Sequence, residues 1–138
     1  MNRWNIPGLL EREVIKRDRC CVYCGVEFTA QSGSRRALPS WEHIINDARI
    51  ITRDNIARCC VGCNASKGTK SLIEWLESEY CRTRGITGES VAAVARQVLS
   101  RIPGVFEQAP NKRILTKRGL CLVGWPILAC RRRATFIE

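Results

Sequence analysis

Hydrophobic residues recur with a helical period in three segments of the chain, residues 9–18, 64–85 and 87–104. Apolar positions spaced three and four residues apart predict a helix with one buried face in each segment. The positions that carry the period are Leu9, Leu10, Val14 and Ile15, then Leu72, Ile73, Leu76 and Tyr80, and finally Val91, Val94, Ala95 and Val98.

Glycine and proline residues are expected to bound these helices. Gly68 lies inside the second segment and predicts a short first helix separated from a second one. The third helix is expected to start near Thr87 or Gly88 and to stop at Pro103-Gly104.

Between these helices the pattern predicts turns and short strands. The stretch "CCVYCGVEFT" is typical of a tight turn closed by Gly25 and followed by an extended piece over residues 26–29. Residues 30–40 are loop-like, and "WEHIIN", residues 41–46, has the aromatic and β-branched composition of a strand. A turn and a loop then lead to a second cysteine group.

The pattern therefore predicts an α+β protein in three parts. Residues 1–80 form a small module, residues 81–104 an accessory helical segment, and residues 105–138 a basic tail without clear periodicity. We expect the tail to be loosely docked or mobile. A unit of about 80 residues has a small core, so it gains much from a metal or another staple.

Charge adds a preference for a polyanionic partner. The formal net charge is +10, and it is uneven: residues 1–80 carry 12 Lys and Arg against 10 Asp and Glu, while residues 81–138 carry 11 against 3. A positive surface favours nucleic acid, since binding a phosphate backbone releases counterions. The first 19 residues lack the apolar core of a signal peptide, and no apolar run is long enough for a membrane span. We therefore expect a cytoplasmic protein.

Two of the cysteine groups are nearly the same hexapeptide, "RCCVYC" at 19–24 and "RCCVGC" at 58–63. In a reducing compartment, paired C-x-x-C turns are typical of a four-thiolate zinc site, with redox pairs or buried thiols as the alternative. Four thiolates leave no open coordination position, which indicates a structural zinc. Cys20 or Cys59 could replace a neighbour at a longer spacing, but the tighter pairs are favoured. The predicted ligands are Cys21, Cys24, Cys60 and Cys63.

The residues between and after these pairs carry a resemblance. "EHI", "DN" and "CNASKG", with the upstream "CVYCG", occur in the order that resembles the zinc-stapled form of the HNH endonuclease family, over about residues 12–80. The resemblance implies a ββα-metal module and DNA hydrolysis with one divalent cation, Mg²⁺ or Mn²⁺. It also implies a phage, mobile-element or restriction origin.

Four residues take site roles by this resemblance. It implies that His43 is the general base, that Asn55 orients it, and that Glu42 and Asn64 bind the catalytic cation. Imidazole suits proton abstraction near neutral pH, and oxygen ligands suit Mg²⁺ or Mn²⁺. Two points count against the role of Glu42 as a cation ligand. The family more often has Asp or His before the catalytic histidine, and adjacent strand residues point to opposite faces unless the strand is bulged.

Each of these residues also has a structural interpretation. His43 can be a packed core histidine, Asn55 a turn residue, and Asn64 a helix cap. Lys67 and Arg53 are expected to contact phosphates, although Lys67 can equally be a solvated surface lysine. Trp41 and Trp75 are expected in the core.

The predicted partner is DNA, without a membrane. The sequence leaves open a homodimer or a partner protein that supplies specificity. The alternative function is a non-catalytic, zinc-stabilised DNA-binding module. A zinc nucleobase deaminase is disfavoured because its H-x-E and P-C-x-x-C signatures are not present.

Overall fold

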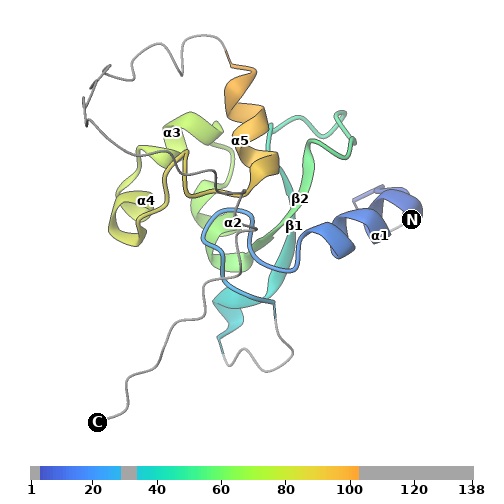
Figure 1. Ribbon diagram of the computed structural model, residues 1–138, viewed down its shortest axis with the longest axis horizontal. Coiled ribbons are helices and arrows are strands. Elements are labelled where there is room, and N and C mark those ends of the chain that lie inside the picture. Colours follow the sequence, from blue (N-terminus) through green and yellow to red (C-terminus); the bar gives the residue numbers. More distant parts are fainter. Residues whose placement is uncertain (1–3, 29–33, 103–138) are drawn as a thin grey trace, which may run out of the picture.

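The computed structural model of the protein describes residues 4–28 and 34–102, and its elements surround a two-stranded sheet (Figure 1). The predicted α+β class agrees with this architecture. In chain order the elements are α1 (Gly8–Arg17), a 3-10 turn η1 (Arg35–Ala37), β1 (Pro39–His43), β2 (Ile56–Cys60), α2 (Val61–Lys67), α3 (Leu72–Leu76), α4 (Glu79–Arg84) and α5 (Ala93–Ser100).

Strands β1 and β2 form an antiparallel hairpin whose two faces meet different helices. The register pairs Glu42 with Ala57 and His43 with Ile56. Directly opposed residues share a face and successive residues alternate, so Glu42 and Ala57 lie on one face and His43 and Ile56 on the other. In Figure 1, α1 lies on one side of the hairpin and α3 and α4 lie on the other.

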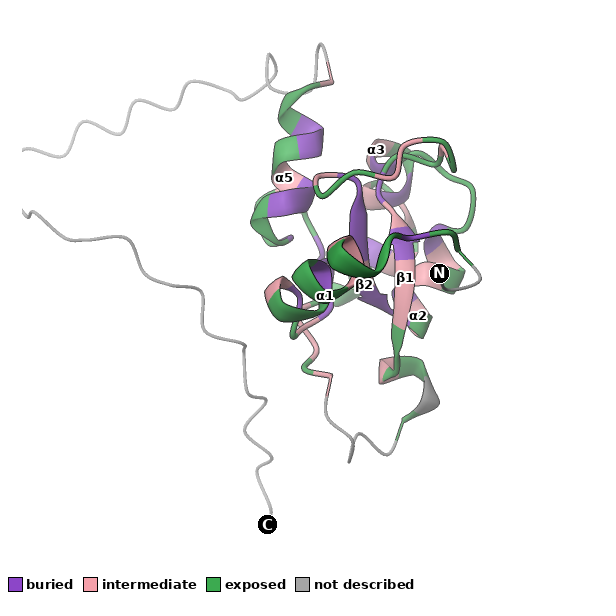
Figure 2. Cartoon of the chain, turned by 90° about the vertical axis from the view of Figure 1, so that its right-hand side faces the viewer, coloured by how far each residue is buried: buried purple, intermediate pink, exposed green. Residues whose placement is uncertain are grey.

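The face that carries His43 and Ile56 is covered by α1. Ile56 forms a small buried cluster with Ile6 and Val14, against which Leu10 and Trp41 pack. Polar contacts fix the end of α1 to β2. The Arg17 guanidinium binds the Asp18 carboxylate at 2.7 Å and donates to the Ile56 carbonyl, and the same carboxylate accepts from the Arg58 backbone N–H. The outer side of α1 stays exposed (Figure 2).

The opposite face of the hairpin belongs to the main core. Ala57 and Cys59 lie there with Trp75, which is fully buried as predicted. Trp41 is only half-buried, in the smaller cluster under α1. The main core also contains Val91, Val94, Ala95 and Val98, the predicted apolar face of the third helical segment.

Gly68 ends α2 with a φ of 52°, so the predicted division of the second helical segment is confirmed. The remainder forms two helices where one was predicted. Ser71 and Glu74 make a reciprocal capping box at the start of α3. The Ser78 hydroxyl accepts from the Cys81 backbone N–H and so caps α4. Because serine favours the N-cap position, a new helix starts there.

The third helix starts later than predicted. Residues 87–90 form a closed turn instead, because Thr87 N–H donates to Ser90 Oγ at 2.8 Å and Ser90 N–H donates to Thr87 Oγ1 at 3.1 Å. The helix α5 begins at Ala93, after Ala92 N–H has donated to the Val22 carbonyl at 2.7 Å.

Two of the predicted parts of the chain can be compared with the structure. The boundary at residue 80 falls inside α4, and residues 81–99 contribute side chains to the same core as residues 21–76. The predicted tail, 105–138, lies outside the described residues, as does Pro103-Gly104. Within the described ranges, no helix has the length and apolar character needed to cross a bilayer.

Candidate metal centre and the residues around His43

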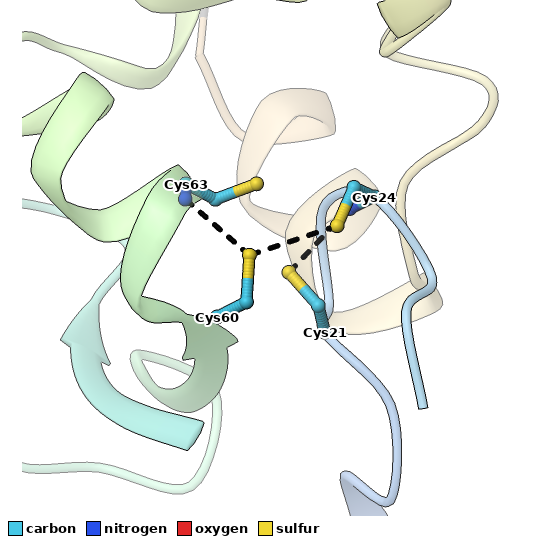
Figure 3. Close-up of side chains that lie close together, drawn as sticks. All are labelled: Cys21, Cys24, Cys60 and Cys63. Atoms are coloured by element: carbon cyan, nitrogen blue, oxygen red, sulfur yellow. Dashed lines mark hydrogen bonds between the residues drawn. The ribbon is translucent and has the colours of Figure 1, made fainter. Parts of the chain in front are cut away.

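Four cysteine sulfurs converge between the first cysteine group and the junction of β2 with α2 (Figure 3). The Sγ atoms of Cys21, Cys24, Cys60 and Cys63 all lie within 4.8 Å of one another. The Cys24 and Cys60 sulfurs are 3.7 Å apart. A tetrahedron with metal–sulfur bonds of about 2.3 Å has edges of about 3.8 Å. The donor set therefore fits a metal such as zinc, as the spacing predicts.

Each pair of ligands is built by a local turn. In the first, the Cys24 backbone N–H donates to Cys21 Sγ at 3.5 Å, and Gly25 closes the turn with a φ of 71°. In the second, Cys60 is both the last residue of β2 and the N-cap of α2, and its Sγ accepts from the Cys63 N–H at 3.4 Å. In each turn, a sulfur that faces the cluster also accepts a hydrogen bond from a backbone N–H group.

The four thiols have different pKa values, because their sulfurs lie close together. The hydrogen bond from Cys21 lowers the pKa of the Cys24 thiol to about 7. Hydrogen bonds from Cys21, Cys24 and Cys63 lower the pKa of Cys60 far below its ordinary value. The pKa values of Cys21 and Cys63 are raised by the same contacts. Cys24 and Cys60 are therefore the two members of the cluster that hold negative charge most readily, and thiolates are the form that binds metal.

The neighbouring cysteines face elsewhere. Cys59 lies on the opposite face of β2 from Cys60, with its Sγ 4.0 Å from Glu42 Oε2. Burial, then the Glu42 charge, raises the pKa of the Cys59 thiol. Cys20 pairs by its backbone with Glu27 in an isolated bridge. The two-residue spacing, rather than the longer one, is thus the spacing that forms the cluster.

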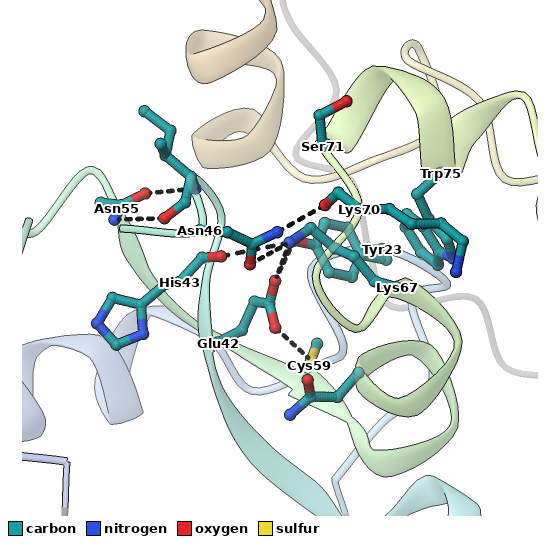
Figure 4. Close-up of polar contacts among 12 residues, drawn as sticks. Tyr23, Glu42, His43, Asn46, Asn55, Cys59, Lys67, Lys70, Ser71 and Trp75 are labelled. Atoms are coloured by element: carbon teal, nitrogen blue, oxygen red, sulfur yellow. Dashed lines mark hydrogen bonds and ion pairs between the residues drawn. The ribbon is translucent and has the colours of Figure 1, made fainter. Parts of the chain in front are cut away.

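Glu42 lies in the interior and forms a charged pair with α2 (Figure 4). Its side chain is 5% exposed, and its Oε1 lies 2.7 Å from Lys67 Nζ. The Tyr23 hydroxyl donates to the same oxygen at 3.1 Å. Burial, followed by the Glu42 charge, raises the pKa of Tyr23 well above its ordinary value, so this hydroxyl stays a donor.

Lys67 is fully buried and links three parts of the chain. Besides Glu42, its ammonium donates to the His43 carbonyl at 3.4 Å and to Asn46 Oδ1 at 3.2 Å. All the surroundings of this ammonium are protein. In this arrangement Lys67 does not reach a phosphate in solution, and its contacts give it the role of fastening α2 to the end of β1.

His43 occupies the last position of β1, and its ring points away from Glu42 (Figure 4). The residue is half-buried, and its Nε2 is a buried atom without a hydrogen-bond partner among the described residues. No bulge turns the strand here, because the regular register continues through His43 and Ile56. The structure therefore places the predicted base and the predicted cation ligand Glu42 on opposite faces.

Asn55 holds the loop that follows His43. Its Oδ1 accepts from the Ile45 N–H at 2.7 Å, and its Nδ2 donates to the carbonyls of Ile45 and Ile50 at 3.2 and 3.0 Å. The Asn55 carbonyl also accepts from the Ile44 N–H. A buried amide that satisfies this many backbone groups fixes the loop conformation. Asn55 thus acts on the backbone next to His43 rather than on its ring.

Asn64 is attached to β1 through its amide nitrogen. Nδ2 donates to Ser40 Oγ at 2.6 Å and to the Trp41 carbonyl at 3.1 Å. Asn64 lies in the first turn of α2 directly after Cys63, but the cap of this helix is Cys60. Its Oδ1 makes no hydrogen bond within the described part of the chain, so it is the atom available to another ligand.

Arg53 remains at the surface. Its side chain is 68% exposed, and its guanidinium lies 3.8 Å from the Glu13 carboxylate. An exposed ion pair of this length is weak, so Arg53 can still contact a phosphate. Arg49 is held by the Asp47 carboxylate, whose pKa the Arg49 hydrogen bonds lower to about 2.

Sequence reasoning missed the internal polar network. One signal was present, because Lys67 lies four residues after Cys63 and such residues share one side of a helix. An inward metal ligand therefore predicts an inward Lys67. Nothing local in the sequence identified Tyr23 or Asn46 as its neighbours.

Comparison with known proteins adds no relative. No family model, curated protein or solved structure matches this chain. We therefore infer function from the four-sulfur cluster and from the side chains that the hairpin and α2 bring together.

Proposed function

We propose that this chain is a zinc-stapled DNA endonuclease in which His43 is the general base. The supporting observation is the placement of His43. The only histidine of the chain ends the strand of a hairpin whose other strand runs directly into the four-sulfur cluster. The order of His43, Asn55 and Asn64 along this unit is the order on which the HNH resemblance rests.

The zinc has a structural role in this proposal. Four sulfurs fill a tetrahedral coordination shell, so the ion has no position for water or substrate. Its ligands come from the turn before the hairpin and from the β2–α2 junction. Zinc therefore holds together the two segments that flank His43, and it takes no part in bond cleavage.

In the proposed reaction His43 accepts a proton from the attacking water. Because Nε2 is enclosed, Nδ1 is the ring nitrogen assigned to this proton. Lys67 holds the His43 carbonyl and Asn55 holds the following loop, so both act as positioning residues for the ring. In-line attack on the phosphorus by the resulting hydroxide leaves a 3′-hydroxyl and a 5′-phosphate.

The residues present do not form the catalytic cation site that the resemblance implies. Asn64 Oδ1 is open to a ligand, but the Glu42 carboxylate is buried and neutralised by Lys67. A cation bound there would have to displace an internal ammonium. We therefore assign no step to a cation held by Glu42, and Glu42 takes a structural role.

The test is plasmid cleavage by the full chain with zinc bound and Mg²⁺ or Mn²⁺ added. We expect cleavage by the wild type and a loss of about 10²- to 10⁴-fold in His43→Ala, the range that general-base catalysis supplies. Zinc content and circular dichroism establish that the variant is folded. Equal cleavage by both proteins, or none by the wild type, contradicts the proposal.

The second candidate is a non-catalytic, zinc-stabilised DNA-binding module. The observation that favours it is the buried Glu42–Lys67 pair, because this pair removes the predicted cation ligand from solvent. DNA binding by the wild type without cleavage, unchanged in His43→Ala, supports this candidate instead.

A further inference from the structure

A groove of about 690 Å³ lies between α1, the residues on either side of the first cysteine turn and the start of β1. Its apolar lining includes Ile15 and Leu38, which are 43% and 44% exposed, and Phe28. No predicted catalytic residue or metal ligand lies on its lining. We call it the α1 groove.

The α1 groove has a marked excess of positive charge. Four cationic side chains line it, Arg12, Lys16, Arg19 and Arg58, against one acid, Glu27. The first three are exposed, and within the described residues no ion pair neutralises any of them. Cations without partners along one wall attract a polyanion, and the apolar lining gives sugars a surface to contact.

The arrangement of these cations is fixed by the fold. Arg12 and Lys16 are four residues apart on α1, so they lie about 6 Å apart along the helix axis and on the same side. Arg19 follows the end of the helix. Arg58 is held from two sides, since its guanidinium stacks over the Phe28 ring at 4.9 Å and donates to the Asp18 carbonyl.

The α1 groove belongs to the face of the hairpin that carries His43. Arg58 pairs with Trp41, and Ile56 pairs with His43, in the same strand register. Positions 56 and 58 of β2 lie on the same face of the hairpin. Arg58, which lines the groove, is therefore on the face that carries His43. The buried Glu42–Lys67 pair lies on the other face.

We propose that the α1 groove binds the phosphate backbone of DNA and leads one strand toward His43. The inference rests on the proposed endonuclease function and names where its substrate lies. Arg12, Lys16 and Arg19 contact successive phosphates, and Arg58 with Phe28 contacts the sugar and phosphate beside them. Such contacts position the duplex and do not read its sequence.

The test compares two triple variants of the full chain in a His43→Ala background, so that the DNA is not consumed. Arg12→Gln/Lys16→Gln/Arg19→Gln removes the groove charges. Each phosphate contact contributes about 0.9 to the slope of log K against log salt concentration. Binding of a labelled duplex should therefore weaken, and the slope should fall by roughly 2 to 3.

The matched control is Lys70→Gln/Arg82→Gln/Arg84→Gln. It removes the same number and types of charge from exposed positions beside α3 and α4, away from α1 (Figure 1). We expect a smaller change in affinity and slope. An equal effect of both variants, or unchanged binding by the groove variant, overturns the groove assignment.

Cleavage by the protein with His43 intact separates this inference from the proposed function. DNA binding that depends on the groove but occurs without cleavage contradicts the endonuclease and leaves the groove in place. Cleavage that is unaffected by the groove variant, with unchanged binding, contradicts the groove alone. Binding of an acidic peptide in preference to DNA contradicts the assigned occupant.

Discussion

At the residue scale, the buried contact between Glu42 and Lys67 dominates the polar interior. Burying the two charged groups costs desolvation free energy. Their attraction at 2.7 Å offsets this cost only because other groups satisfy their remaining hydrogen bonds. Tyr23 donates to the carboxylate, while Asn46 and the His43 carbonyl accept from the ammonium. Removing either partner leaves an uncompensated charge in the core.

We predict that Lys67→Met destabilises the protein by about 3–5 kcal/mol, the usual result of breaking a buried ion pair. Urea unfolding of the zinc-loaded chain measures the change. The double variant Glu42→Gln/Lys67→Met removes both charges and should recover a large part of the lost stability. A Lys67→Met protein as stable as the wild type contradicts the buried pair.

Glu42→Gln distinguishes the structural role of Glu42 from cation binding. If Glu42 is structural, the variant loses stability, and its cleavage activity changes no more than its folded fraction. Unchanged stability with a large loss of Mg²⁺-dependent cleavage contradicts that role and restores Glu42 as a ligand.

At the element scale, the sulfur cluster stabilises the junctions between elements. Cys60 ends β2 and caps α2, and Cys63 lies in the first turn of α2. Cys21 and Cys24 belong to the turn before the hairpin. Within this turn the Val22 backbone N–H donates a hydrogen bond to the Arg58 carbonyl of β2. A two-stranded hairpin and a helix of seven residues are each marginal alone. A metal that joins them supplies stability that these short elements lack.

We predict that Cys63→Ser releases zinc and unfolds the hairpin and α2. Three remaining thiolates bind zinc more weakly, and binding free energy is folding free energy in small metal-stapled units. Zinc content and circular dichroism measure the two effects. Cys81→Ser is the matched control, since Cys81 is equally buried but lies outside the cluster. Zinc loss in the control alone, or in neither variant, contradicts the assignment.

At the scale of the whole molecule, one core connects the cluster to the later helices. Cys21 and Val22 pack in the same core as Val94, Ala95 and Val98 of α5. Ala92 N–H donates to the Val22 carbonyl, so the first cysteine turn also receives a bond from the segment before α5. Loss of the metal is therefore expected to loosen the molecule beyond the hairpin.

The stability of the whole protein should consequently depend on pH. The pKa of Cys24 is lowered from its ordinary value of 9.0 to about 7 in the folded chain. A lowered pKa means that folding favours the thiolate, so the contribution of Cys24 is fully present above pH 9 and is lost as the pH falls through about 7. The raised pKa values of Cys21 and Cys63 act in the opposite direction. Bound zinc extends the stable range to lower pH, because protons must then displace the metal.

We predict release of zinc as the pH falls from about 8 to about 4, together with a lower unfolding midpoint. A colorimetric zinc indicator and thermal unfolding measure the two. Zinc retained through the whole range, with a constant midpoint, contradicts thiolate ligation.

The sequence by itself determined the features that depend on local spacing. Two cysteines three positions apart can face one ion within a single turn, so the ligand pairs followed from "CCVYC" and "CCVGC". The apolar positions of α5 and the break at Gly68 followed from helical periodicity in the same way. The capping by Ser78 and the turn between Thr87 and Ser90 are also local, but several polar residues nearby competed for these roles.

Only the tertiary structure decided where Glu42, His43 and Lys67 point. The alternation of a strand separates Glu42 from His43, but it does not say which of them faces the core. That choice depends on α2 covering one face of the hairpin and α1 the other, and the residues involved are distant in sequence. Because Lys67 and Tyr23 meet Glu42 on the α2 side, the carboxylate is buried, and His43 is left on the face that continues into the α1 groove.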